Sequence, residues 1–533
     1  LNNGTESYSV LYLKMTKTDD WYLTMVHVFM LIVLVLVVLL YAYLTRNKNY
    51  WKNLGVPFDK PVPLFGSLLP LAKQAISVGD FFCKLYRSTD HPYYGLFILG
   101  QPSLLLRDPR LIQDMLIGDF ECFQERMGGK CDHDQIGTNI LFYMKASSWK
   151  VMRGNLSPFF SSSKLSRMLE LINSVGENLV SHIRKKTSVG LAVNSLDAST
   201  MYVTDIVASC FFGFISDSLS KGVTEFLQIS ELWTKLTFMR VVQTSCFVFV
   251  PTLAKMFKIK LFDQTSEKYL QDVFLQVMGE RKRSGQERRD LVDLLIKIEK
   301  EQSHLFKREE IIAQTLQLHF GSYDTTSYST SFALYELCAN VGIQKKLRGE
   351  INSVLSQHEI VSLEAIKKMS YLHMVVSGRY GPCVCYKFYH ALTESLRKHP
   401  IIPIMDRVCS KPYTIPNSSV TIKAGTPCFV SIYGLHYDSR YFPNPETFDP
   451  ERFSPENKAN IIPGTYIPFG VGPRNCIGSR FAVLAVKVAL ICIIRNFEFE
   501  LAEDAGSFLG YDRKAFLLTP RNKSLNIKYK PIS

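Results

Sequence analysis

The cysteine in one glycine-rich stretch near the end of the chain is placed for binding rather than for cross-linking. Residues 469–478 read FGVGPRNCIG, with Cys476 as the single thiol. A disulfide would need a second cysteine, and a zinc site would need further Cys or His residues at short spacing. Gly470 and Gly472 permit a tight turn whose backbone N–H groups can point at the sulfur and stabilise its negative charge. We therefore expect a rigidly held thiolate ligand; the alternative is a buried structural cysteine in a loop.

The residues that follow Cys476 indicate what the thiolate would bind. Gly478 has no side chain, so the helix predicted for the next segment, SRFAVLAVKVALICIIRNF, can pack close to a flat macrocycle. A thiolate that faces a macrocycle at the start of a helix predicts an axial ligand to haem iron.

Four further motifs precede this stretch. They are WKVMR with Trp149 and Arg153, GSYDTT at 321–326, ESLR with Glu394 and Arg397, and FDPERF with Arg452. Each is weak alone. In this order, and with FGVGPRNCIG, they make the chain resemble the cytochrome P450 family of haem-thiolate monooxygenases from about residue 21 to its end. Stretches such as PYYGLFILGQPSLLLRDP resemble insect microsomal members. The resemblance implies a P450 fold, mainly α with a small β region, and haem b as cofactor.

The resemblance also implies roles in catalysis. Cys476 would be the proximal iron ligand, whose thiolate favours cleavage of the O–O bond. Asp324 and Thr325 would deliver protons to dioxygen, the carboxylate as a relay from solvent and the hydroxyl close to the oxygen. Adjacent helical residues do not share a face, so we expect a locally widened helix at Gly321. Taken alone, this stretch would read equally well as an ordinary Ser/Thr-rich core helix.

Further residues would hold the haem and support its pocket. Arginine side chains suit haem propionates because guanidinium and carboxylate groups pair in a bidentate way. The cofactor-binding set that the resemblance implies, beside Cys476, is Trp149, Arg153, Arg407, Phe469, Arg474 and Gly478. Glu394, Arg397 and Arg452 would form a buried ion network behind the haem, which specifies geometry more than it adds stability.

Two features depart from the family pattern. Gly321 is followed by Ser322, where Ala-Gly or Gly-Gly is usual; Ser322 could bond to its own backbone or crowd the oxygen site. Residues 378–393, GRYGPCVCYKFYHALT, are inserted just before the ESLR motif. They contain two glycines and a proline, so they cannot simply extend a helix. We interpret them as a retained intron or gene-model error, with a true surface insertion as the alternative. A true insertion would put the placement of Glu394 and Arg397 in question.

The elements that carry these residues follow an apolar N-terminal segment. Residues 21–44 carry no Asp, Glu, Lys or Arg, and about 20 apolar residues suffice to span a bilayer. We predict a membrane anchor at 21–45, a basic and Pro-rich extended hinge at 46–66 and a haem-binding catalytic domain at 67–533. Residues 1–20 form a short N-terminal segment, and if Met15 or Met25 is the true start, residues 1–14 or 1–24 are an artefact of translation. Arg46, Lys48 and Lys52 favour a cytosolic catalytic domain, and the resemblance implies that the membrane is that of the endoplasmic reticulum. The alternative to the anchor is a cleaved signal peptide.

Composition limits the remaining classes of function. Hydrophobic residues make up 47% of the 533 residues, and twelve dispersed cysteines fit a reducing compartment. The net charge of +14 suits binding to anionic membrane lipid or to an acidic protein partner. Nucleic-acid binding is disfavoured, because the sequence has no basic tract with interleaved aromatic residues.

We therefore expect a monooxygenase for lipophilic substrates, xenobiotics or endogenous lipids. Its electrons would come from an NADPH-dependent flavoprotein reductase, with cytochrome b5 as a second partner. Substrate walls are expected at 127–143, 226–262, 316–320, 401–404 and 508–518. The alternatives are a haem-thiolate isomerase or dehydratase, which Asp324-Thr325 disfavours, and an inactive, haem-poor product of a damaged gene.

Overall fold

The computed structural model forms two compact units, which are described separately. One comprises Leu1–Leu69 with Gly95–Pro102, and the other comprises Pro70–Tyr94 with Ser103–Ser533. The chain passes between them within strands β1 (Tyr93–Ile98) and β2 (Gln101–Leu106). The structure describes residues 5–358, 360–376, 378–379, 390–391, 394–503, 510–521 and 525–532.

The first unit contains the predicted anchor within one long helix. Helix α1 (Thr5–Thr45) is continuous, and from Tyr22 its apolar side chains are exposed. The helical span that begins at Tyr22 is long and apolar enough to cross a membrane. The hinge predicted as extended is bent instead. It contains α2 (Tyr50–Asn53), and Val62 and Gly66 exchange backbone hydrogen bonds across a tight turn. The indole N–H of Trp51 donates to Leu96 O at 3.1 Å.

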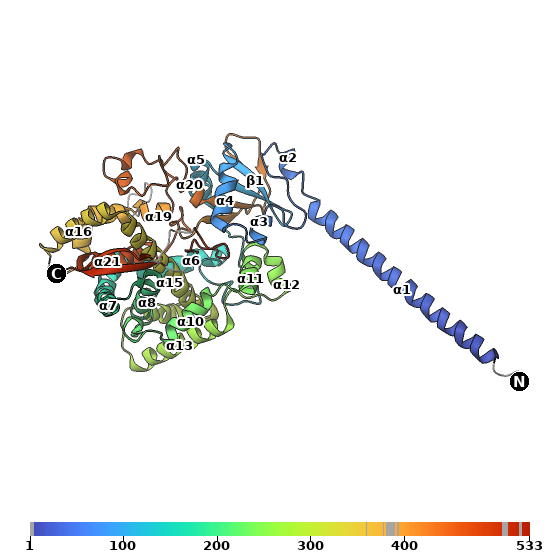
Figure 1. The fold of residues 1–533 in the computed structure, drawn as a ribbon, viewed down its shortest axis with the longest axis horizontal. Coiled ribbons are helices and arrows are strands. Elements are labelled where there is room, and N and C mark those ends of the chain that lie inside the picture. Colours follow the sequence, from blue (N-terminus) through green and yellow to red (C-terminus); the bar gives the residue numbers. More distant parts are fainter. Residues whose placement is uncertain are drawn as a thin grey trace. The chain divides into compact units, whose positions relative to one another are not determined.

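The second unit is mainly helical, as the sequence predicts (Figure 1). Its longest helix, α15 (Arg308–Ala339), packs against α8 (Ser195–Val207), α13 (Gln264–Ser284) and α21 (Ser479–Asn496). The other helices, in chain order, are α3 (Leu69–Ala72), which begins at the boundary, α4 (Val78–Arg87), α5 (Pro109–Gln113), α6 (Ala146–Leu156), α7 (Ser162–Thr187), α9 (Ser218–Lys221), α10 (Glu225–Thr234), α11 (Phe238–Phe249), α12 (Pro251–Met256), α14 (Leu291–Glu301), α16 (Val341–Leu355), α17 (Leu363–Lys368), α18 (Ser370–Val376), α19 (Glu394–Lys398) and α20 (Ile432–His436).

Helix α15 is buried although many of its residues are polar. Several of its serine and threonine hydroxyls donate to the carbonyl one turn earlier, as in Ser327 to Tyr323 O at 2.6 Å and Thr330 to Thr326 O at 2.9 Å. Small hydroxyl side chains that bond in this way leave no unpaired hydrogen and allow close packing. Helix α21 is also buried along most of its length, because nearly all its side chains are apolar.

Small sheets complete the second unit. Strand β9 (Pro427–Ser431) pairs in parallel with β2 at Leu104–Leu106 and antiparallel with β6 (Ile404–Val408). Another sheet has the order β10 (Phe497–Leu501), β11 (Asn526–Pro531) and β3 (Val193–Asn194), and β7 (Tyr413–Thr414) pairs with β8 (Thr421–Ile422). The small β region is therefore confirmed, and β6 carries Ile404, Met405 and Asp406 of the site described next.

The insertion at 378–393 separates α18 from α19. Strand β4 (Gly378–Arg379) pairs antiparallel with β5 (His390–Ala391), which brings the two ends of the insertion together. The rest of the insertion, including Cys383 and Cys385, lies outside the described residues. Where the family pattern predicts one helix, the structure has two.

Candidate active site

The glycine-rich stretch forms the predicted turn. Gly470 and Gly472 have φ angles of 72° and 78°, in the left-handed region that favours glycine. A Cβ at Gly472 would lie 2.0 Å from Leu116 O, so a larger residue does not fit there. The Cys476 N–H donates to Phe469 O at 2.9 Å and closes the loop directly before α21.

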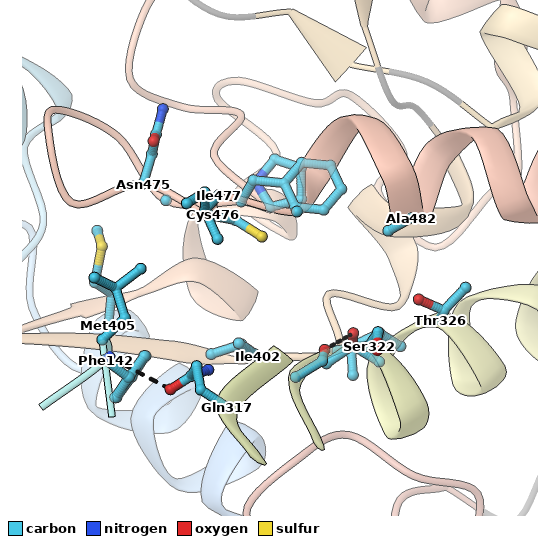
Figure 2. A pocket seen from close by; sticks show the side chains of 18 of the residues that line it. Phe142, Gln317, Ser322, Thr326, Ile402, Met405, Asn475, Cys476, Ile477 and Ala482 are labelled. Atoms are coloured by element: carbon cyan, nitrogen blue, oxygen red, sulfur yellow. Dashed lines mark hydrogen bonds between the residues drawn. The ribbon is translucent and has the colours of Figure 1, made fainter. Parts of the chain in front are cut away.

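The Cys476 thiol faces a cavity and is exposed to it (Figure 2). Burial raises the pKa of this thiol, while the backbone N–H groups of Gly478 and Ser479 and the Arg153 charge lower it. Arg153 also holds the loop, because its two terminal nitrogens donate to Asn475 O and Oδ1, both at 2.8 Å. These opposing influences describe a thiol that a bound cation would convert to a thiolate.

The cavity has a volume of about 270 Å³ and a largely apolar wall. Each range expected to form a substrate wall contributes to it, through Leu141, Phe142, Tyr143, Val248, Gln317, Leu318, Ile401, Ile402, Ile404 and Phe516. Figure 2 shows Cys476 on one side of this space and α15, with Ser322 and Thr326, on the other. Two separate elements therefore face each other across a space that can hold a ligand.

Thr325 lies on the α15 wall and Asp324 does not. The Thr325 hydroxyl donates to Gly321 O at 2.7 Å, and both residues line the cavity. Asp324 is not among the lining residues. Helix α15 is an uninterrupted α-helix here, so the expected widening at Gly321 is not present. Ser322 donates to Leu318 O at 2.6 Å, which is the backbone bond considered above.

Arginines gather around the cavity with few carboxylates to balance them. Arg126, Arg153 and Arg474 line it, and Arg407 is buried beside Asp406 with 2% of its surface exposed. Arg126 pairs with Asp406 at 2.9 Å. Nε and Nη2 of Arg407 and Nε of Arg474 have no hydrogen-bond partner among the described residues. Burial and the neighbouring arginines lower the pKa of Arg407, and burial lowers that of Arg474 to about 9.

This excess of buried positive charge is the strongest indication of the ligand. Burying an unpaired guanidinium is costly, so the site calls for an anionic partner. Haem fits, because its two carboxylates would pair with these arginines while its iron meets Cys476.

The other residues expected at the cofactor also face this space. Trp149, Phe469 and Gly478 line the cavity, and the Arg474 guanidinium lies 4.5 Å from the centre of the Trp149 ring. A Cβ at Gly478 would approach no described atom closer than the Phe160 ring at 3.9 Å. The cavity side of this glycine is therefore open, as a flat cofactor requires.

The structure forms the predicted ion network in spite of the insertion. Arg397 donates from Nε to Glu394 Oε2 and from Nη2 to Oε1, both at 2.7 Å, and both side chains are fully buried. Arg452 reaches Glu394 Oε1 at 3.4 Å, and the Asp449 N–H donates to the same oxygen at 2.9 Å. The concern that the insertion displaces Glu394 and Arg397 is therefore not supported by their geometry.

Sequence reasoning did not single out two residues that the structure places at the cavity. Arg126 joins the arginine group, and Gln317 accepts from the Phe142 N–H at 3.3 Å. A polar residue in the otherwise apolar run LQLHF was the available signal for Gln317. Arg126 had no comparable local signal, because its position depends on contacts with β6.

Comparison with known proteins agrees with the geometry. The family model described as Cytochrome P450 matches residues 56–527. Cytochrome P450 6j1 of Blattella germanica is 35% identical over 483 residues, which cover 90% of this chain and 93% of that protein. Cytochrome P450 6k1 of the same insect is 33% identical, covering 89% and 92%. A probable cytochrome P450 6a13 of Drosophila melanogaster is 32% identical, covering 92% and 97%.

Proposed function

The chain belongs to the cytochrome P450 family, and we propose that it is a membrane-anchored monooxygenase that oxidises lipophilic substrates at the Cys476 cavity. Membership makes it a haem-thiolate oxidoreductase with haem b as cofactor. Beyond membership, we propose roles for the residues that bind haem and transfer protons, a class of substrate, an electron donor and a membrane location. The observation that carries the proposal is the cavity lined by the Cys476 thiol, by Arg126 and Arg474, whose Nε atoms have no partner among the described residues, and by the α15 wall.

The residues that would hold the haem divide by chemistry. Cys476 Sγ is the iron ligand, and haem so bound supplies the activation of dioxygen. Arg126, Arg407 and Arg474 would pair with the propionates, and the ring face of Trp149 lies against the Arg474 guanidinium. Arg153 acts mainly through Asn475, whose carbonyl and amide oxygens it fixes one residue before the ligand.

Thr325 and Asp324 would manage protons from two sides of α15. Thr325 lines the cavity, and its Oγ1 is fixed by its bond to Gly321 O. Asp324, one position earlier on the helix, does not line the cavity and would exchange protons outside it. Proton transfer between them requires water or a small local motion, because adjacent helical side chains point about 100° apart.

The substrate would be lipophilic and the electrons would come from NADPH. The wall is mostly apolar, which favours apolar ligands with few polar groups. In the overall reaction, substrate, O2, NADPH and one proton give hydroxylated substrate, water and NADP+. A flavoprotein reductase, with cytochrome b5 as a second donor, would transfer the electrons. The apolar span in α1 and the basic residues after it support an anchor in the endoplasmic reticulum, with the catalytic domain in the cytosol.

Reconstitution tests this function. The full chain in vesicles with an NADPH-dependent flavoprotein reductase is given a panel of lipophiles under isotope-labelled O2. We expect NADPH-dependent products that carry one labelled oxygen atom, and none from Cys476→Ala. Isomerised or dehydrated products formed without NADPH would contradict the proposal and support the isomerase or dehydratase alternative.

A further inference from the structure

Two glutamines on successive turns of α15 bind the same neighbouring segment in different ways. Gln314 is completely buried, and its side-chain oxygen accepts from the Leu141 N–H at 3.1 Å. Its amide nitrogen donates to Asn139 O at 2.8 Å and to Glu310 O at 2.6 Å. Every polar atom of the Gln314 side chain is therefore used within the protein, and its role is structural.

Only one of the two polar side-chain atoms of Gln317 forms a hydrogen bond to a described residue. Its Oε1 accepts from the Phe142 N–H at 3.3 Å. Because that partner is a donor, the bonded atom must be the oxygen, so the orientation of the amide is determined. Figure 2 shows the oxygen turned toward Phe142 and the nitrogen turned away from it. Gln317 Nε2 makes no hydrogen bond to any residue that the structure describes.

The free amide nitrogen belongs to the cavity wall. Gln317 lines the cavity, as do the apolar side chains of Leu318 and Ile402. A Cβ at Gly321 would lie 3.3 Å from Gln317 Nε2, so a larger residue there would crowd the amide. The hydroxyls of Ser322, Thr325 and Ser329 on the same wall already donate to backbone carbonyls.

We propose that Gln317 determines substrate specificity by donating from Nε2 to an uncharged oxygen acceptor, such as a carbonyl, ester or ether, on an otherwise apolar substrate. This inference rests on the proposed function, since it concerns the substrate of that site. A site built to bond a polar group discriminates strongly against an analogue without it, because its own polar group is left unpaired. A ligand with an acceptor there satisfies a donor that an alkyl ligand would leave unsatisfied.

Thr326 offers the one competing donor on this wall that needs separate treatment. Its Oγ1 is buried without a partner among the described residues and faces the same cavity. It lies nine residues beyond Gln317, about 13 Å along the helix axis. A small ligand bonded to one of these groups is therefore too far from the other to bond both.

The test compares two ligands of the same shape. 2-Acetylnaphthalene and 2-isopropenylnaphthalene differ only in an acceptor oxygen against a CH2 group. Their dissociation constants for the full chain are measured by equilibrium dialysis, which does not depend on haem, and in parallel by the absorption change of the haem. From wild type to Gln317→Met, we expect the preference for the ketone over the alkene to fall about tenfold, as for one lost hydrogen bond.

Three further variants make the result specific. Gln317→Glu keeps an acceptor for the Phe142 N–H but lacks the amide donors, and should also lose the preference. Gln314→Met and Thr326→Val should keep it, although Gln314→Met is expected to unfold at a lower temperature. An unchanged preference in Gln317→Met, or an equal loss in Gln314→Met or Thr326→Val, overturns the proposal. Failure to form a thiolate-ligated haem would instead contradict the proposed function, and the dialysis ratio would still decide the role of Gln317.

Discussion

At the scale of single residues, substitution of Arg407 should stabilise the haem-free protein and weaken its retention of haem. Its guanidinium is buried, and two of its nitrogens have no partner among the described residues. We predict that Arg407→Met stabilises the haem-free chain by about 1–3 kcal/mol, because it removes an unpaired buried charge. The same change should weaken haem retention about tenfold or more, because a propionate loses its partner. Thermal unfolding and transfer of haem to an excess of a haem-scavenging globin measure the two effects.

Arg513 provides a matched control, since it is exposed. Arg513→Met should change neither the stability nor the haem retention. If Arg407→Met left haem retention at the wild-type level, Arg407 would not be a propionate partner.

Lys487 provides a prediction about pH. It is buried in α21 with 3% of its surface exposed, where it contacts His373 Nδ1. Burial lowers its pKa to about 7, with Glu350 opposing the shift. Between pH 7 and the ordinary lysine value the unfolded chain binds more protons, so stability rises with pH. We predict that Lys487→Met is more stable than wild type at pH 7.5 and that the difference shrinks by pH 9.5.

Urea unfolding at these two pH values, both above the ordinary histidine range, measures the difference. A difference that is independent of pH would show that Lys487 carries the same charge in the folded and unfolded chain.

The residues that sequence predicts best are those whose role depends on near neighbours. The turn at Gly470 and Gly472 and the position of Cys476 depend on a few consecutive residues, and the structure forms the turn as expected. Arg126 and Gln317 depend on how residues 120–145 lie against β6 and α15, and no local pattern reports that. The lack of partners for Nε and Nη2 of Arg407 was likewise not predictable, because it depends on how two other arginines, Arg126 and Arg474, and one carboxylate pack around it.

At the scale of elements, the ion network of α19 should dominate local stability. Glu394 and Arg397 are both fully buried, so Glu394→Ala leaves a buried guanidinium without its main partner. We predict a loss of about 3–5 kcal/mol and much lower haem content. The exposed pair Lys268 and Asp272 of α13 is the control, and Asp272→Ala should cost about 0.5 kcal/mol or less. Urea unfolding and haem content per chain are measured for both variants. Equal losses in Glu394→Ala and Asp272→Ala would contradict the role of the Glu394–Arg397 pair in stability.

The insertion leaves this network intact for a reason that the sequence contains. Glu394 and Arg397 are both on the far side of the insertion and one turn apart on α19, and Arg452 also follows it. Their mutual geometry does not require α18 and α19 to be one helix. What the sequence could not predict is the pairing of β4 with β5, because it joins residues across the insertion.

Helix α15 shows where sequence prediction succeeds and where it fails at this scale. It extends over Arg308–Ala339, a long stretch without proline in which a single helix could be expected from the sequence. The predicted widening at Gly321 was wrong. The hydroxyls of Ser322 and Thr325 bond to the carbonyls of the preceding turn, and the helix stays regular.

For the whole molecule, the membrane attachment of the anchor can be separated from the chemistry. The apolar side chains of α1 from Tyr22 onward are exposed, and the span is long and apolar enough to cross a membrane. We predict that removing residues 1–45 shifts the chain from the alkali-resistant membrane fraction to one released by salt or alkali. The haem spectrum should be unchanged. Retention in the alkali-resistant fraction would show that other segments provide the attachment.

The fold class was predictable, and the arrangement of the strands was not. Strand positions near 95–100, 103–108 and 428–433 could be recognised from apolar runs, and β1, β2 and β9 lie there. The parallel pairing of β2 with β9 joins residues more than 300 positions apart, so it depends on the packed helices rather than on either strand. The hinge was predicted as extended from its prolines alone, whereas Gly66 allows the chain to turn back on Val62.

The central claim is that the full chain, including residues 378–393, binds haem through Cys476. The most direct test is the reduced carbon monoxide difference spectrum of the full chain, beside Cys476→Ala and a deletion of residues 378–393. We predict the red-shifted Soret band of a thiolate-ligated haem in the full chain and in the deletion, and its absence in Cys476→Ala. A band in the deletion alone would contradict the claim for this chain, and a band that persists in Cys476→Ala would show that another residue is the ligand.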